Sequence, residues 1–194
     1  MKRAYLLAGG RSERFGVDKA RVRIDGIPQI HRLASGLSQN GWRVTIVAQS
    51  ISDYEDLGLE VITDLQPHAG PLAGLIAALT DCEARGEAHC LISNIDLVAS
   101  DWTWLEAMQR VMSRTKPSVV VFQCAEFMPL PGWYSTGALE TARSLWDQGK
   151  RSLRDLHESL EGSIATLEWP IDQIPRSFNT PDELRAILGR AQGL

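Results

Sequence analysis

The chain has few cysteines, and their spacing indicates neither a metal site nor a disulfide framework. Its 194 residues include three cysteines, Cys82, Cys90 and Cys124, which are scattered and odd in number. None belongs to a Cys-x-x-Cys pair, which argues against a zinc site, a dithiol redox centre and a disulfide scaffold. We expect three thiols in a reducing compartment.

Long hydrophobic runs are also missing. No apolar stretch approaches the length of a membrane-spanning helix. Residues 1–10 begin with basic side chains, but their apolar part is too short for a signal peptide and leads into glycines and charge. We therefore expect a soluble, cytoplasmic protein with no membrane partner.

An excess of positive charge is absent as well. Twenty Lys and Arg residues face 24 Asp and Glu residues, which gives a formal net charge of −4. A nucleic-acid-binding domain would carry a basic surface, so no nucleic-acid partner is expected. The balance still permits a local basic pocket for a phosphorylated small molecule.

No repeat, low-complexity segment or linker interrupts the chain, and apolar runs alternate with amphipathic stretches. This βα pattern predicts an α/β fold with a mostly parallel sheet, in a single domain over residues 1–194. Strands are predicted at 4–8, 43–48, 59–63, 89–95, 118–124 and 163–169. Helices are predicted at 27–39, from Pro71 onward, at 102–112, 135–146 and 153–160, and from Pro181 after an N-cap at Thr180.

A glycine-rich, basic segment follows the first predicted strand. Gly9 and Gly10 allow backbone N–H groups to approach phosphate oxygens, and Arg11, Arg14 and Lys19 supply positive charge. Ligands of open parallel sheets bind outside the carboxyl ends of the strands, which is where this segment lies. The Walker pattern GxxxxGK[ST] and the dinucleotide pattern GxGxxG are both absent. The segment predicts a nucleoside triphosphate site of another type, and exposed surface charge is the alternative interpretation.

Residues 6–20, LLAGGRSERFGVDKA, resemble the L-A-G-G-x-S-x-R-[MF]-G-x-D-K-A signature of the molybdenum cofactor guanylyltransferases, the MobA family of nucleoside-triphosphate transferases. DLQPHAGPLAGL (64–75) is similar to the family's acidic residue followed by G-P-L-A-G. The resemblance continues through a P-L-x-x-[LVW]-Y segment (128–139), an R-S-L helix (151–160) and an N-x-N-T-P-E-[DE]-L ending (178–184). The matches fall in chain order and cover nearly the whole sequence.

The resemblance implies a three-layer, Rossmann-like nucleotidyltransferase that transfers GMP from GTP to the phosphate of molybdopterin or its molybdenum form and releases pyrophosphate. It implies Mg²⁺ as cofactor, GTP and molybdopterin as partners, and cofactor-insertion proteins as further partners. The attacking phosphate oxygen is already anionic at neutral pH, so catalysis consists mainly of positioning and charge neutralisation.

The family pattern also implies roles for individual residues. Arg14, Lys19 and Asp96 are the implied catalytic residues. The two cations would counter triphosphate charge, and Asp96, at the end of a strand, would hold the metal. Exposed charge for the cations and a turn-forming role for the aspartate are the alternatives. Asn179 would contact the acceptor, or else simply help to cap the last helix.

The remaining implied residues bind the nucleotide. Leu7, Ala8 and Gly9 would line the base and ribose, with Gly10 beside them, and Asp64 would contact the nucleotide or else serve in a turn. Lys19 and Asp96 belong to this set as well. The LAGG form of the loop goes with guanine in this family, which favours GTP over CTP.

Three positions depart from the family pattern. The usual D-x-P after the metal aspartate is absent, since Leu97 and Val98 follow Asp96. Ala48 is aligned with a family asparagine that meets the nucleotide, and Ser177 replaces the first asparagine of N-x-N-T-P. These changes keep two alternatives open. One is a related nucleotidyltransferase with another acceptor or with CTP, and the other is a weakly catalytic nucleotide- or cofactor-binding protein.

Overall fold

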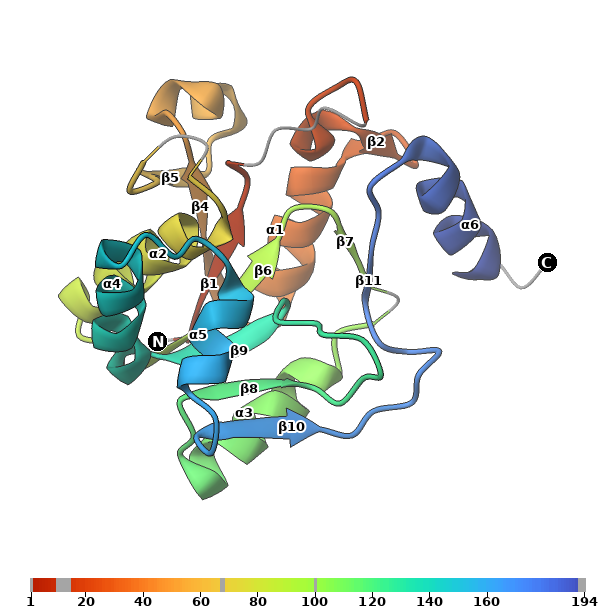
Figure 1. The fold of residues 1–194 in the computed structure, drawn as a ribbon. Helices are drawn as coiled ribbons and strands as arrows, with labels where there is room; N and C mark the ends of the chain where they lie inside the picture. The colour runs from red at the N-terminus through yellow and green to blue at the C-terminus, as the bar shows by residue number, and fades with distance from the viewer. Residues whose placement is uncertain (1, 10–14, 67–68, 100, 192–194) are drawn as a thin grey trace.

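The computed structural model describes residues 2–9, 15–66, 69–99 and 101–191, and a seven-stranded sheet forms its centre (Figure 1). The strands are β1 (Lys2–Leu7), β4 (Trp42–Ala48), β5 (Glu60–Thr63), β6 (His89–Asn94), β8 (Val119–Phe122), β9 (Gly132–Ser135) and β10 (Ile164–Leu167). Their order is β10-β8-β9-β6-β1-β4-β5. β9 pairs antiparallel with both β6 and β8, whereas the other pairings are parallel. The predicted three-layer α/β fold with a mostly parallel sheet is confirmed.

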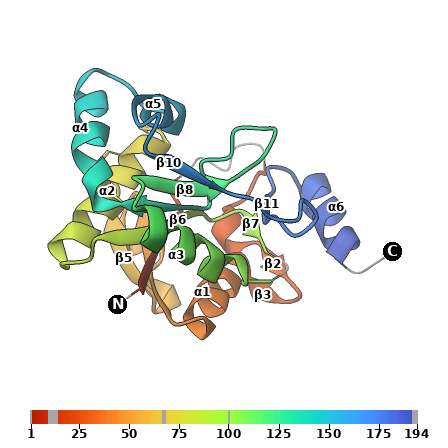
Figure 2. The ribbon, with the colours of Figure 1, turned by 90° about the horizontal axis from the view of Figure 1, so that it is seen from below.

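Helices cover both faces of the sheet (Figure 2). One face carries α1 (Gln29–Gln39) and α3 (Trp104–Thr115), and the other carries α2 (Pro71–Ala84), α4 (Leu139–Asp147) and α5 (Leu153–Ser159). The last helix, α6 (Pro181–Ala191), lies to one side of the sheet (Figure 1). Short elements complete the chain: β2 (Arg23–Ile24), β3 (Ile27–Pro28), β7 (Leu97–Val98), β11 (Arg176–Ser177) and the 3₁₀ turns η1 (Lys19–Arg21), η2 (Ile51–Asp53), η3 (Glu55–Leu57) and η4 (Thr136–Ala138).

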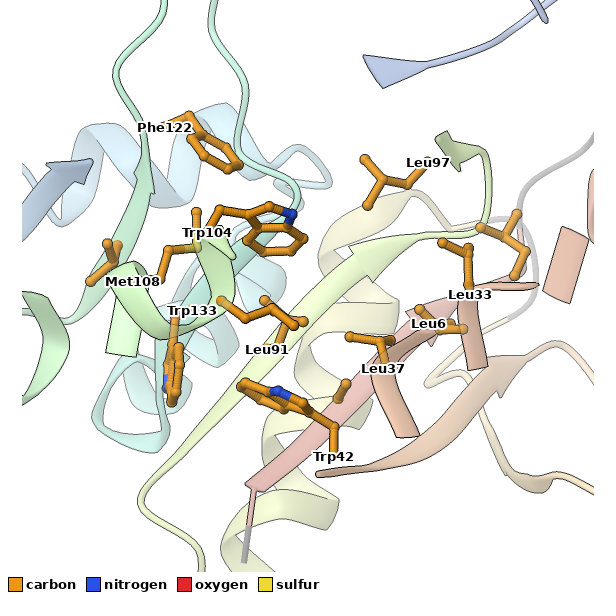
Figure 3. Packing of buried hydrophobic residues seen from close by; sticks show 14 of the residues in the cluster. Leu6, Leu33, Leu37, Trp42, Leu91, Leu97, Trp104, Met108, Phe122 and Trp133 are labelled. Carbon is orange, nitrogen blue, oxygen red and sulfur yellow. The ribbon is translucent and has the colours of Figure 1, made fainter. Parts of the chain in front are cut away.

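The central strands are mostly apolar because both of their faces are largely buried. Tyr5 and Leu6 are neighbours in β1 and belong to the cores on opposite faces, and both have an exposed fraction of 0%. On the α1 and α3 face, Trp42 and Trp133 meet edge to face at 4.9 Å between ring centroids, close to Leu91 (Figure 3). Packing on both faces therefore fixes the positions of the residues that follow the ends of the strands.

Three predicted helices begin later than expected, and one of them, predicted from residue 102, starts at Trp104. The helix predicted from residue 27 starts at Gln29, because Ile27 and Pro28 pair with Arg23 and Ile24 in a small hairpin. The helix predicted from residue 135 starts at Leu139, because Ser135 ends β9 opposite His89 of β6 and a 3₁₀ turn follows. The carboxyl edge of the sheet is unaffected by any of these changes.

All three cysteines are free thiols; Cys82 and Cys90 are buried, and Cys124 is half-buried. Within the described residues, no helix combines the length and the apolar character needed to cross a bilayer.

A buried histidine fixes the loop between β8 and β9. The Tyr134 hydroxyl donates to the carbonyl oxygen of Pro129 at 2.8 Å and lies 2.9 Å from Nε2 of His157 in α5. A phenol has one proton, so Nε2 of His157 carries the proton shared with Tyr134. Phe127 packs edge to face on the imidazole with 5.1 Å between centroids. Burial lowers the pKa of His157 to about 4 from its ordinary value of 6.5.

This histidine makes stability depend on pH. The unfolded chain takes up a proton at His157 below pH 6.5, whereas the folded protein resists protonation until about pH 4. The stabilisation is complete above pH 6.5 and is lost as the pH falls toward 4, with a decrease in the free energy of unfolding of about 3 kcal/mol. Urea unfolding at several pH values should show this slope, and His157→Gln, which retains an N–H donor, should flatten it. His31→Gln is the control and should keep the wild-type slope.

Candidate active site

The carboxyl ends of four neighbouring strands bring polar residues to one edge of the sheet. Gly9 follows β1, Gln49 follows β4, Asp64 follows β5 and Asp96 follows β6. Open α/β sheets bind their ligands at this edge. The sequence-predicted residues that the structure describes gather at or beside this edge.

Lys19, Asp96 and Asn179 form one cluster although they are far apart in the chain. Lys19 Nζ donates to Asp96 Oδ2 at 2.8 Å and to Asn179 Oδ1 at 3.0 Å. The Lys19 and Asp96 side chains are 13% and 15% exposed, so the ion pair is mostly shielded from solvent. The structure thus places one cation in contact with both a carboxylate and a carboxamide at the strand ends.

The turn that carries Lys19 is anchored on both sides. Asp18 Oδ1 accepts a hydrogen bond from the Ala20 N–H at 2.9 Å and so caps η1, and Ala20 itself is fully buried. The buried Tyr54 donates to Asp18 Oδ2 at 3.1 Å. Arg21 pairs with Asp56 at 2.7 Å. These contacts tie the turn to the segment between β4 and β5, so the Lys19 side chain projects from a fixed backbone.

Asp96 is held by a short ladder in place of the family's proline. Leu97 and Val98 form β7, which pairs with Ser177 and Arg176 of β11, and the backbone oxygen of Asp96 accepts from the Phe178 N–H at 3.2 Å. This ladder fixes the segment after the aspartate, where D-x-P is missing. It also brings residues 176–179 to the active edge.

Asn94, the last residue of β6, joins Asp96 to Ser177. Its Nδ2 contacts Asp96 Oδ1 and lies 2.6 Å from Ser177 Oγ. The short serine at position 177 therefore meets a carboxamide supplied from the sheet. Sequence reasoning missed Asn94; its position two residues before Asp96, at a strand end, was the available signal.

Asp64 packs between two glycines. A Cβ atom added at Gly9 would lie 3.3 Å from Asp64 Oδ2, and one added at Gly74 would lie 3.6 Å from the same oxygen. Burial raises the pKa of Asp64, while the backbone N–H groups of Leu65 and Gln66 oppose that rise. The absence of side chains at both glycine positions lets the carboxylate sit against the backbone of the first loop.

Gln49, and not Ala48, carries the amide at the loop. Ala48 is fully buried in the core, so it cannot meet a ligand. Gln49 Nε2 donates to the carbonyl oxygen of Gly9 at 2.6 Å. Ser50, the other candidate substitute, caps η2 through its side chain.

Of the other predicted site residues, some are described by the structure and some are not. Leu7 and Ala8 are half-buried at the end of β1, beside the loop. Gly10, Arg11 and Arg14 lie outside the described residues. The predicted capping of α6 is confirmed in part: Thr180 Oγ1 accepts from the Glu183 N–H at 3.2 Å, but the Glu183 carboxylate binds the N–H of Asn179 at 2.6 Å.

Asp96 is the residue of this edge that suits a metal. Among the described residues, no group of three histidine, cysteine, aspartate or glutamate side chains gathers closely enough to enclose an ion. Mg²⁺ commonly takes one or two carboxylates and completes its shell with water and substrate phosphates. A carboxylate such as that of Asp96 fits that mode, and the described residues of this edge do not form an all-protein metal cage.

Comparisons with known proteins agree with this geometry. A family model described as a MobA-like NTP transferase domain matches residues 4–163. A probable molybdenum cofactor guanylyltransferase of Opitutus terrae is 33% identical over 150 residues, which cover 77% of this chain and 74% of that protein. The molybdenum cofactor guanylyltransferase of Rhizobium meliloti is 30% identical over 200 residues, which cover 94% of this chain and 88% of that protein.

A solved structure shows the same fold. The crystal structure of molybdopterin-guanine dinucleotide biosynthesis protein A from Archaeoglobus fulgidus matches with a TM-score of 0.77 and 20% sequence identity. The match covers 99% of this chain and 100% of that one, so it includes β11 and α6, which lie beyond the family model.

Proposed function

The chain belongs to the MobA-like NTP transferase family, and from this premise we propose that it is a molybdenum cofactor guanylyltransferase. It transfers GMP from GTP to the terminal phosphate of molybdopterin, forming molybdopterin guanine dinucleotide and releasing pyrophosphate. The observation that carries the proposal is that Lys19 contacts both Asp96 and Asn179 at the carboxyl edge of the sheet. We further propose that residues 1–194 act as one domain, because β1 and β10 belong to the same sheet.

The reaction makes and breaks one bond each at the α-phosphorus of GTP. A phosphate oxygen of the acceptor forms a P–O bond, the bond to the bridging oxygen breaks, and that oxygen leaves with pyrophosphate. The nucleophile is already anionic, so no protein base is needed. The residues must hold two anions together and offset the charge that builds on the leaving group.

Each residue of the edge has a proposed part in this task. Leu7, Ala8 and Gly9 line the base and ribose, and Gly10 presents its backbone to phosphate. Asp64 contacts the nucleotide from its place against the loop.

The proposed catalytic residues are charged. Lys19 and Arg14 would bind the phosphates, and Asp96 would hold Mg²⁺, which would supply further positive charge against the phosphates. Asn179, whose side-chain carbonyl oxygen accepts from Lys19, would contact the acceptor.

Thermal unfolding with GTP, CTP, ATP and UTP, each with and without Mg²⁺, tests the nucleotide part of the proposal. A ligand that binds only the folded state at a hundredfold excess over its Kd stabilises it by about 2.7 kcal/mol. We expect a rise in Tm that is selective for GTP and depends on Mg²⁺.

Two other outcomes of this experiment contradict the proposal. A shift with CTP and none with GTP would assign the chain to cytidylyl transfer. No shift with any nucleotide, alone or with molybdopterin present, would favour a binding protein without catalysis.

A further inference from the structure

Gln29, the first residue of α1, has a polar side chain that is completely buried. Its exposed fraction is 0%, although glutamine is mostly found at protein surfaces. A carboxamide loses its hydrogen bonds to water when it is buried, so it must find partners inside the protein. Those partners show what the buried glutamine does in this fold.

The Gln29 carboxamide bonds to the backbone on both sides of Asp96. Its Nε2 donates to the carbonyl oxygen of Ile95 at 3.2 Å and to that of Leu97 at 2.6 Å. Because backbone carbonyl oxygens only accept, the nitrogen of the carboxamide must be the atom that faces them. Its Oε1 accepts from Nη1 of Arg32, three residues later in α1, at 3.3 Å. Both donors of the side chain are therefore directed to the turn that carries Asp96.

The backbone of Gln29 is bonded to the turn that carries Lys19. Its N–H donates to the carbonyl oxygen of Val22 at 2.8 Å, and the N–H of Val22 donates to the carbonyl oxygen of Lys19 at 3.3 Å. The two turns lie 77 positions apart in the chain, and their side chains meet where Lys19 Nζ donates to Asp96 Oδ2 at 2.8 Å. Gln29 thus joins the two backbone segments from which the Lys19–Asp96 pair projects.

We propose that Gln29 is a positioning residue for GMP transfer, an assignment that rests on the function proposed above. It holds the backbone around Asp96 so that the carboxylate faces both Lys19 and the Mg²⁺ that this carboxylate would bind. Gln29 is fully buried and cannot reach a substrate, so it acts through Asp96. Groups that orient a metal ligand typically contribute about 10–100-fold to metal affinity or activity.

Gln29→Met tests this role, and Thr45→Val is its matched control. Methionine keeps the length and the unbranched shape of glutamine but removes both N–H donors. Thr45 is also 0% exposed and accepts from Arg3 Nη1 at 2.9 Å, but it lies within β4, and valine keeps its shape. Both substitutions remove buried hydrogen bonds, and only Gln29→Met removes contacts with the Asp96 turn.

Three quantities would be measured for the wild type and both variants. The first is kcat for GMP transfer to molybdopterin, and the second is the free energy of unfolding in urea. The third is the Mg²⁺ midpoint, the Mg²⁺ concentration at which the GTP-induced rise in Tm is half complete. The Mg²⁺ midpoint requires no turnover and reports on the metal ligand.

We expect Gln29→Met to lower kcat about tenfold and to raise the Mg²⁺ midpoint about tenfold. The KM for GTP at saturating Mg²⁺ should stay near the wild-type value, because the loop that binds the nucleotide is untouched. Thr45→Val should lose stability while kcat and the Mg²⁺ midpoint stay at their wild-type values. A change in the Mg²⁺ midpoint is what a merely structural role would not produce.

Two results with Gln29→Met would overturn the proposal. One is a loss of stability with a wild-type kcat and a wild-type Mg²⁺ midpoint, which would make Gln29 purely structural. The other is a raised KM for molybdopterin with an unchanged Mg²⁺ midpoint. That result would place the effect at Asn179, which follows the Phe178 N–H that donates to the Asp96 carbonyl oxygen.

A second variant covers the case in which Gln29→Met does not fold. Gln29→Asn keeps the carboxamide on a shorter side chain that cannot reach both carbonyl oxygens, so it too should raise the Mg²⁺ midpoint, and a wild-type midpoint would overturn the proposal. If the wild type responds to GTP and Mg²⁺ but transfers no GMP, the proposed function fails. The Mg²⁺ midpoints of the variants then still decide whether Gln29 positions Asp96.

Discussion

Asp96→Asn is expected to lower kcat for GMP transfer by about 10²–10³-fold, the usual cost of removing one charge-stabilising group from a reaction centre. Asparagine keeps the size of the side chain and an oxygen that can accept from Lys19. It loses the negative charge, which is what a divalent cation needs from a single protein ligand. The effect should therefore fall on the metal-dependent part of the reaction.

Two assays and one control variant separate this explanation from a general defect. The first assay is the rate of GMP transfer by Asp96→Asn at raised Mg²⁺ concentration. If the substitution only weakens metal binding, added Mg²⁺ should restore much of the rate. If the carboxylate charge is also needed to hold Lys19, added Mg²⁺ should restore little of it. The GTP-induced rise in Tm should lose its dependence on Mg²⁺. Asp147→Asn, an exposed carboxylate at the end of α4, should behave as wild type in both assays. A wild-type kcat in Asp96→Asn would exclude the proposed role of this residue.

The long strands and their helices were predictable because their signals are local. β1, β4 and β6 are apolar on both faces, and α2 starts at a proline, so each segment carries its own pattern. Their parallel arrangement then fixes which residues lie at the carboxyl edge. This is why the location of the site could be read from the order of strands and loops alone.

Three short strands, β7, β9 and β11, were not predicted because their pairing is set by distant partners. β9 has four residues and includes Gly132, and it pairs antiparallel with β6 and β8 on its two sides. β7 and β11 have two residues each and pair across more than seventy positions of sequence. Two residues are too few to show the alternation of apolar and polar side chains that indicates a strand, so no sequence pattern predicts such a ladder.

The same limit applies to the site. Lys19 and Asp96 belong to a family motif and could be named, but their direct contact links positions 77 residues apart, and the bond from Lys19 to Asn179 links positions 160 apart. Asn94 and Tyr54 belong to no motif, and only the folded chain shows that they hold Asp96 and the turn before Lys19. A sequence motif identifies the residues that carry functional groups, whereas the residues that orient those groups are found only in the folded structure.

Lys19→Met is expected to lower kcat by about 10²–10³-fold, because the ammonium is the described cation best placed to offset charge on the departing pyrophosphate. Methionine keeps an unbranched side chain of similar length, so packing over the Phe178 ring, 5.8 Å from Nζ, is largely retained. The variant should also lose stability, since Asp96 remains as a mostly shielded carboxylate without its counter-ion. Lys150→Met removes an exposed Lys–Asp pair of similar length, 2.9 Å, and should leave kcat unchanged.

Combining Lys19→Met with Asp96→Asn distinguishes catalysis from mutual positioning. If the pair only holds the loop in shape, the second substitution should cost nothing further in kcat, and stability should recover relative to Lys19→Met because the unpaired charge is gone. If each residue acts on the substrates, the two losses in kcat should multiply while the recovery of stability remains. Steady-state kinetics and urea unfolding of the four proteins measure both quantities. We expect multiplied losses in kcat with recovered stability, because Lys19 counters leaving-group charge while Asp96 holds the metal, and these are separate tasks in one transition state.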